Sequence, residues 1–136
     1  MKRWKVVDGF RNSYPGEITS VHYAEGATLE SKTLGFFTFK TLKAAKAYKN
    51  SAPKDFNGQL SIIEVKCYGR GETINVCPSS INDIAHFLVN KDAIKKEAEQ
   101  INNYSIRAGN YIALSTIDVW KCAEGTITYK KLKVLT

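Results

Sequence analysis

Short segments in which apolar and polar residues alternate run along much of the chain, and this period of two predicts strands. They are RWKVVDGF at the N-terminus, EITSVHYA from Glu17 to Ala24, and LSIIEVKCYG, in which Ile63, Val65 and Cys67 share one face. Phe36 to Phe39 is an aromatic segment with strand propensity, and ETINVC predicts a further strand. The first part of the chain therefore contains several half-buried strands.

A helical period interrupts these strands between about Leu42 and Asn50. Apolar residues recur on one side of this segment and lysines on the other, which is typical of a helix that packs on a sheet. The inner side is formed by Leu42, Ala45 and Tyr48, and the outer stripe by Lys43, Lys46 and Lys49.

Two further helices are expected one after the other in the second half. Ser80 with Asp83 has the form of a capping box, which predicts a helix to about Asn90. Its buried stripe is expected to be Ile81, Ile84, Ala85 and Leu88. KDAIKKEAEQINN continues as the second helix, and its narrow apolar line suits a surface helix or a seam between subunits. That line is Ile94, Ala98 and Ile101.

The remaining segments complete an α+β pattern. EGATLESKT predicts a polar loop, and the tail from NYIALSTIDVW to TITYKKLKVLT predicts a β-hairpin around Glu124 and Gly125. Strands, one short helix, more strands, two consecutive helices and a hairpin indicate an α+β fold with a largely antiparallel sheet. No repeat or linker divides the sequence, so residues 1–136 are expected to form a single domain.

The net charge of the chain indicates which kinds of partner it could bind. Twenty Lys and Arg against thirteen Asp and Glu give a net charge of +7, which favours anionic partners through attraction that weakens with salt. No apolar run is long enough to span a bilayer, and Asp8, Arg11 and Asn12 interrupt any signal-peptide core. We expect no membrane association and a cytoplasmic location.

The cysteines and histidines do not predict a metal site. Cys67, Cys77 and Cys122 have spacings that fit no zinc pattern, and their number is odd. We therefore expect free, partly buried thiols in a reducing compartment. With His22 and His86 as the only histidines, neither a metal nor a cofactor is expected.

Phe87 and Asn90 are candidate ligand contacts, because residues at i and i+3 share one side of a helix. An aromatic ring can stack on a nucleobase, and an amide can hydrogen-bond a base edge or a ribose hydroxyl. His86 lies beside Phe87 and is a candidate for the same site. The alternative is that these residues make contacts between helices and that Asn90 only ends its helix.

Arg70 and Arg107 are candidate phosphate clamps, since Lys outnumbers Arg sixteen to four in this chain. A guanidinium binds phosphate oxygens through a planar fork, whereas an ammonium is a point charge. Both arginines fall in expected turns, where binding residues are common, and Tyr104 precedes the second of them. The alternative is that both are solvated surface charges.

Familiar catalytic and nucleic-acid motifs do not occur. Gly69-Arg70-Gly71 lacks the length and the Lys-Ser/Thr pair of a phosphate-binding loop. The lysine stripe has no aromatic residues interleaved in the manner of an RNA-recognition sheet, and no helix-turn-helix pattern occurs. Sequence-specific nucleic-acid binding therefore has little support from the residues.

Two segments together resemble a known group of proteins. GFFTFKTLKAAKAY contains G-F-F-x-F, and LSIIEVKCYGRGETI contains I-x-E-V-x-x-x-G. Over roughly residues 34–76 this layout resembles small bacteriophage and prophage proteins, and among them the Thoeris anti-defence family. The layout is also similar to the N-terminal part of ADP-ribosyltransferase-like folds.

The resemblance implies a protein that sequesters cyclic ADP-ribose-type signals without cleaving them and that forms a homodimer or higher oligomer. In such a site Arg70 and Arg107 would clamp phosphates, and Phe87, helped by His86 or Tyr104, would stack on the base. Asn90 would hydrogen-bond the ribose or base. One alternative is an ADP-ribosyltransferase-like enzyme acting on NAD or ADP-ribose, with Glu64 or Glu72 as the acid. The other is an inhibitor that binds an acidic protein or a nucleic-acid surface.

Overall fold

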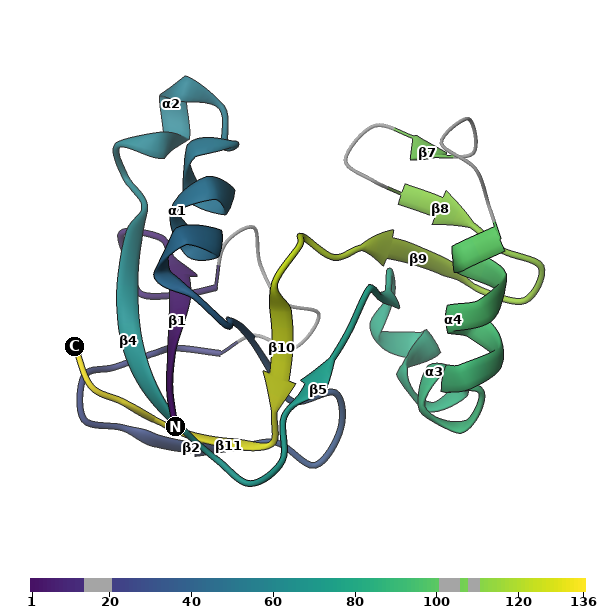
Figure 1. Cartoon of the computed structure of the whole chain (residues 1–136), viewed down its shortest axis with the longest axis horizontal. Coiled ribbons are helices and arrows are strands. Elements are labelled where there is room, and N and C mark those ends of the chain that lie inside the picture. Colours follow the sequence, from purple (N-terminus) through teal and green to yellow (C-terminus); the bar gives the residue numbers. More distant parts are fainter. Residues whose placement is uncertain (14–20, 101–105, 108–110) are drawn as a thin grey trace. The chain divides into compact units, whose positions relative to one another are not determined.

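The computed structural model describes residues 1–13, 21–100, 106–107 and 111–136, and these form two compact units (Figure 1). Unit 1 comprises Met1–Thr73 and Glu124–Thr136, and unit 2 comprises Ile74–Ala123. The chain thus leaves unit 1 after residue 73 and returns to it at residue 124. The expected single domain stays a prediction.

Unit 1 is built on an antiparallel sheet whose seven described strands run in the order β2-β11-β4-β1-β3-β10-β5 (Figure 1). The strands are β1 (Lys2–Val7), β2 (Thr28–Glu30), β3 (Phe36–Phe39), β4 (Ser61–Tyr68), β5 (Glu72–Thr73), β10 (Thr126–Tyr129) and β11 (Lys131–Val134). Alternation along β4 buries Ile63, Val65 and Cys67, as the sequence predicted. These side chains join a core that includes Tyr23, Phe36 and other buried residues of the sheet.

Helix α1 (Leu42–Asn50) has the predicted limits. Its N-cap is Thr41, whose hydroxyl accepts a hydrogen bond from the Ala44 N–H at 3.1 Å. Ala45 is fully buried, Tyr48 is half-buried against Phe39, and Leu42 remains 39% exposed at the first turn. A short helix, α2 (Lys54–Asn57), follows.

Two expectations about the N-terminal half need correction. EGATLESKT was expected to be a loop, but Thr28–Glu30 within it is strand β2, because Leu29 pairs opposite Leu132 of β11. The expected strand from Glu17 to Ala24 lies partly outside the described residues. Of its remainder, His22 forms only an isolated bridge to Asn12.

Unit 2 combines helices with a four-stranded antiparallel sheet, in the order β6-β9-β8-β7 among its described strands (Figure 1). The elements are β6 (Val76–Pro78), a 3₁₀ turn (Ile81–Asp83), α3 (Ile84–Val89), α4 (Lys91–Gln100), β7 (Ile106–Arg107), β8 (Tyr111–Ala113) and β9 (Asp118–Lys121). The single strand predicted for ETINVC is instead divided between β5 of unit 1 and β6 of unit 2.

The buried face of α3 differs from the predicted stripe. Ile81 is 59% exposed and Ala85 is exposed, whereas Ile84 and Phe87 are buried. The segment before this helix is a 3₁₀ turn, in which the Ser80 hydroxyl accepts from the Asn82 N–H at 3.3 Å.

Helix α4 follows as predicted and buries Ile94 and Ala98 within unit 2, while Ile101 lies outside the described residues. Because these two side chains are buried, they do not form an exposed seam. Among the described residues, no helix is long and apolar enough to cross a membrane.

The predicted α+β class with a mostly antiparallel sheet is confirmed. The C-terminal hairpin is formed by β8 and β9, and the Leu114 N–H donates to the Ile117 carbonyl at its turn. Glu124 and Gly125, where the turn was expected, instead connect β9 of unit 2 to β10 of unit 1.

We predict that Gly35→Ala destabilises the protein by about 2–3 kcal/mol, measured by guanidinium unfolding. Gly35 has a φ of +87°, and an added Cβ would lie 2.8 Å from the Tyr129 carbonyl oxygen. The matched control is Gly26→Ala, because Gly26 has a φ of +82° but no atom within 4 Å of the added Cβ. The control should cost only about 1 kcal/mol. Equal losses in both variants would contradict a steric contribution from Tyr129.

Candidate functional site

The structure places the predicted site residues in both units. Arg70 is exposed in the turn between β4 and β5 of unit 1. His86, Phe87 and Asn90 lie on or beside α3 of unit 2, and the backbone of Arg107 lies in β7. Tyr104 is outside the described residues. Only the α3 group is therefore brought together by contacts that the structure describes.

Phe87 has no exposed surface and packs in the interior of unit 2. A nucleobase cannot stack on a ring that is fully covered unless the helix first opens. The side chain of Phe87 therefore supports α3 in this conformation. Any stacking surface must come from an aromatic residue that solvent can reach.

His86, Asn90 and Thr116 form an exposed polar cluster in unit 2. The His86 Nε2 lies 3.2 Å from the Thr116 hydroxyl, and the Asn90 Nδ2 lies 3.3 Å from His86 Nδ1. Asn90 Nδ2 also donates to the His86 carbonyl at 3.0 Å. In the tautomer with its proton on Nε2, that N–H donates to the Thr116 hydroxyl and Nδ1 accepts from the amide. Asn90 thus caps its own helix and orients His86.

One row of residues crosses the four strands of unit 2 in register. Cys77 of β6 lies opposite Trp120 of β9, Trp120 lies opposite Tyr111 of β8, and Tyr111 lies opposite Arg107 of β7. Residues directly opposite each other in an antiparallel sheet share a face and have neighbouring Cβ positions. We call these four positions the cross-strand row.

The two aromatic residues of the cross-strand row are in contact and reach the surface. Their ring centroids are 5.4 Å apart at an interplanar angle of 73°, which is edge-to-face packing. Trp120 is 37% exposed and Tyr111 is half-buried. The indole is therefore partly exposed and packs against the neighbouring tyrosine ring.

Two further contacts fix the strands that carry these rings. The Tyr111 hydroxyl donates a hydrogen bond to the Asp118 carboxylate, which joins β8 to β9. The Glu97 carboxylate accepts from the Ser115 N–H at 2.9 Å and from the Ser115 hydroxyl at 2.7 Å. These bonds hold the pKa of Glu97 below its usual value, with the backbone N–H making the larger contribution. The turn between β8 and β9 is thereby attached to α4.

Trp120 and Tyr111 were not singled out in the sequence, although a signal was present. In DVWK the residues alternate, so Val119 points to the interior and Trp120 to the other face. The position of Tyr111 opposite Trp120 depends on the turn at Leu114–Ile117, and the sequence was expected to turn at Glu124 and Gly125 instead. The register of β8 against β9 was therefore not predicted, and neither was the contact between the two rings.

Unit 1 contains a shallow, open depression of about 430 Å³ beside α1. Its lining combines two lysines, an amide and a hydroxyl with apolar side chains. The lining residues are Lys46, Lys49, Asn50, Leu60, Ser61 and Ile62. The sequence showed the lysine stripe, but it did not show that the first residues of β4 lie beside it.

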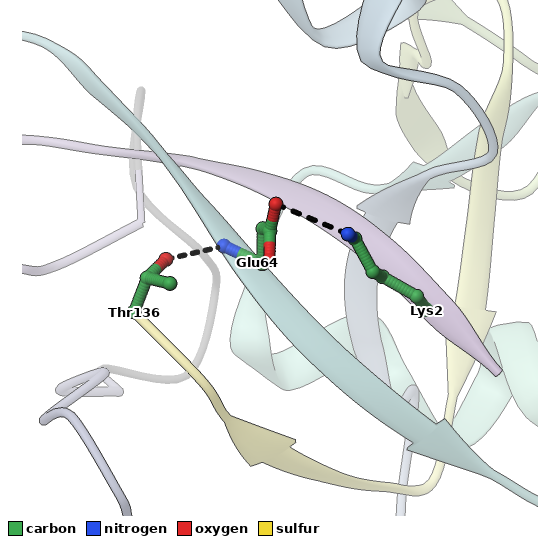
Figure 2. A network of polar contacts seen from close by, with 3 residues as sticks. All are labelled: Lys2, Glu64 and Thr136. Atoms are coloured by element: carbon green, nitrogen blue, oxygen red, sulfur yellow. Dashed lines mark hydrogen bonds and ion pairs between the residues drawn. The ribbon is translucent and has the colours of Figure 1, made fainter.

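Glu64, named for the enzyme alternative, takes part in a polar network at the C-terminus (Figure 2). Its carboxylate lies 3.2 Å from the Lys2 ammonium, and its backbone N–H donates to the Thr136 hydroxyl at 2.9 Å. The network joins β1, β4 and the last residue of the chain. The ammonium lies in contact with the oxygen that an acid catalyst would use.

The three cysteines are free, as the sequence predicted. Burial raises the pKa of the Cys67 thiol to about 11. The Cys122 thiol hydrogen-bonds Cys77, and this bond, together with burial, raises the pKa of Cys122. Both thiols therefore stay protonated at neutral pH and are poor nucleophiles. Among the described residues, no group of three or more His, Cys, Asp or Glu lies close enough to hold a metal ion.

Comparison with known proteins gives no relative for this chain. No family model matches the sequence, no curated protein matches it, and no solved structure matches the fold. The likeness to small phage proteins stays a prediction, and function has to be argued from the residues of the chain itself.

We predict that the pKa of Tyr111 lies above its usual value of about 10, because its hydroxyl donates to Asp118 and the neighbouring negative charge disfavours the phenolate. Asp118→Ala should lower this pKa towards the usual value, measured by NMR titration of ¹³C-labelled tyrosine. A pKa raised by folding adds stability below the unfolded pKa, and this stability is lost as pH rises through the folded pKa. An unchanged titration in the variant would contradict the hydrogen bond.

Proposed function

We propose that the protein binds a phosphorylated nucleotide of the cyclic ADP-ribose type and holds it without cleaving it. The observation that carries this proposal is the register of the cross-strand row, in which exposed Trp120 lies opposite half-buried Tyr111 and Tyr111 lies opposite Arg107. The row would offer a surface for a base and, one strand further, a cation for a phosphate.

Stacking on Trp120 would replace the role predicted for Phe87. Stacking of a base on an aromatic side chain contributes about 1–3 kcal/mol, and every base has a face that can stack. Packing against Tyr111 would restrict the rotamers of the indole, so less side-chain entropy would be lost on binding. His86 and Asn90 stay candidates for polar contacts in the same unit.

Arg107 would clamp a phosphate. Adjacent strands lie about 4.8 Å apart, so its Cα lies roughly two strand spacings from that of Trp120. A nucleotide with one end stacked on the indole could place a phosphate over this part of the row. Arg70 belongs to unit 1 and stays a separate prediction.

Sequestration fits the chemistry of these residues better than turnover does. Holding a ligand requires a slow off-rate and no nucleophile or general base. Of the two acids named for an enzyme, Glu64 lies in an ion pair with Lys2. The expected homodimer or higher oligomer stays part of the proposal, and size-exclusion chromatography with and without ligand would test it.

The deciding experiment incubates the purified protein with cyclic ADP-ribose isomers, NAD and cyclic oligonucleotides. Free ligand is measured by mass spectrometry before and after heat denaturation. Depletion followed by release of the intact ligand is the expected result. Release of a converted product would indicate the ADP-ribosyltransferase-like alternative, and no depletion of any ligand would contradict the proposal.

We predict that Trp120→Ala and Arg107→Ala each weaken binding of the depleted ligand by about tenfold or more without unfolding the protein. Isothermal titration calorimetry measures the affinity and circular dichroism the fold. Tyr68→Ala is the matched control, because Tyr68 is an aromatic residue with the same 37% exposure in unit 1. If the Tyr68 variant weakens binding as much as the Trp120 variant, the row is not the site.

A further inference from the structure

A long segment of unit 1 carries positive charge that no acid balances. Between Glu30 and Asp55 the sequence contains no Asp or Glu. The lysines of this segment are Lys32, Lys40, Lys43, Lys46, Lys49 and Lys54. Among the described residues, none of the last five forms an ion pair, and Lys40, Lys43, Lys46 and Lys54 are exposed. Their charge is therefore available to an external anion.

In the folded protein, two of these lysines line the depression beside α1. Lys46 and Lys49 of α1 line the depression together with the amide of Asn50 and the hydroxyl of Ser61. The apolar part of its lining is Leu60 and Ile62, of which Leu60 is buried. Ammonium, amide and hydroxyl groups all donate hydrogen bonds, and all four polar side chains lie at one opening. This combination suits an oxyanion attached to an apolar group.

We propose that this surface binds the sugar-phosphate backbone of a single-stranded nucleic acid, with one phosphate in the depression between Lys46 and Lys49. The adjoining sugar then contacts Leu60 and Ile62. Binding is independent of base sequence, because only phosphate and sugar are contacted. The surface is in unit 1, and it is distinct from the cross-strand row of unit 2.

A linear polyanion fits the surface better than a small phosphate does. A single phosphate would reach only the lysines that line the depression and would leave Lys43 and the neighbouring lysines without an anion. The helix rises about 9 Å between Lys43 and Lys49, which is long enough to face more than one phosphate of a strand. A strand in the depression therefore places further phosphates near lysines that lie outside it.

The experiment measures fluorescence anisotropy of a labelled single-stranded oligonucleotide of mixed sequence over a series of salt concentrations. The variant Lys46→Gln with Lys49→Gln should weaken binding about tenfold at low salt. It should also reduce the slope of log K against log salt by about 0.7, because the contacts to one phosphate are lost. Circular dichroism confirms that the variant is folded.

The matched control is Lys66→Gln with Lys133→Gln, which removes the same charge from exposed positions that pair with each other on β4 and β11. It should change binding by less than about twofold. Equal weakening by both variants would overturn the proposal in favour of general attraction by net charge. Displacement of the oligonucleotide by polyglutamate at equal charge, or the absence of any oligonucleotide binding, would overturn it as well. Depletion of the nucleotide ligand by the Lys46→Gln and Lys49→Gln variant should be unchanged, so failure here and failure of the nucleotide site are distinguishable.

Discussion

The pairing of β1 with β4 is the constraint on which unit 1 depends. All six residues of β1 have partners in β4, from Lys2 opposite Lys66 to Val7 opposite Ser61, and each strand has a further neighbour on its other edge. A slip of one residue would turn the apolar side chains of β4 from the core towards solvent. The same register determines where Ser61 and Ile62 lie beside α1. The pairing of β1 with β4 therefore determines both the packing of the core and the lining of the basic depression.

The elements of unit 1 that the sequence predicted well are those whose local pattern and tertiary packing agree. Helix α1 begins after a capping threonine and has an alanine on its buried side, and β4 alternates without interruption. Strand β2 was missed because a stretch of three residues with one apolar side chain has no period of its own. Its identity as a strand comes from β11, which lies about a hundred residues further along the chain. Such pairing is not visible in a local window.

The residues of the candidate site also depend on contacts between distant segments, which a local window of sequence does not show. Phe87 is predicted because it is aromatic and shares a helix side with Asn90, but its ring is fully buried in the folded chain. Trp120 is exposed because residues alternate between the two faces of its strand. It packs against Tyr111 because of the turn between β8 and β9, and the position of this turn was not predicted from the sequence. Residue type and spacing thus named side chains that could bind a nucleotide. Only the strand register determined which of them lie together.

The insertion of unit 2 between two paired strands has a consequence for how the chain acquires its structure. Thr73, the last residue before unit 2, lies opposite Ile127, which comes soon after the chain returns. During synthesis the central strands of unit 1 are made early, but β10 and β11 are made last, and until then β3 and β4 each present an open edge. Contacts between such distant parts of a chain form slowly, because a long loop must close first. The nascent protein therefore passes through a stage in which its largest sheet is incomplete, and chaperones that cover unpaired strand edges would act at that stage.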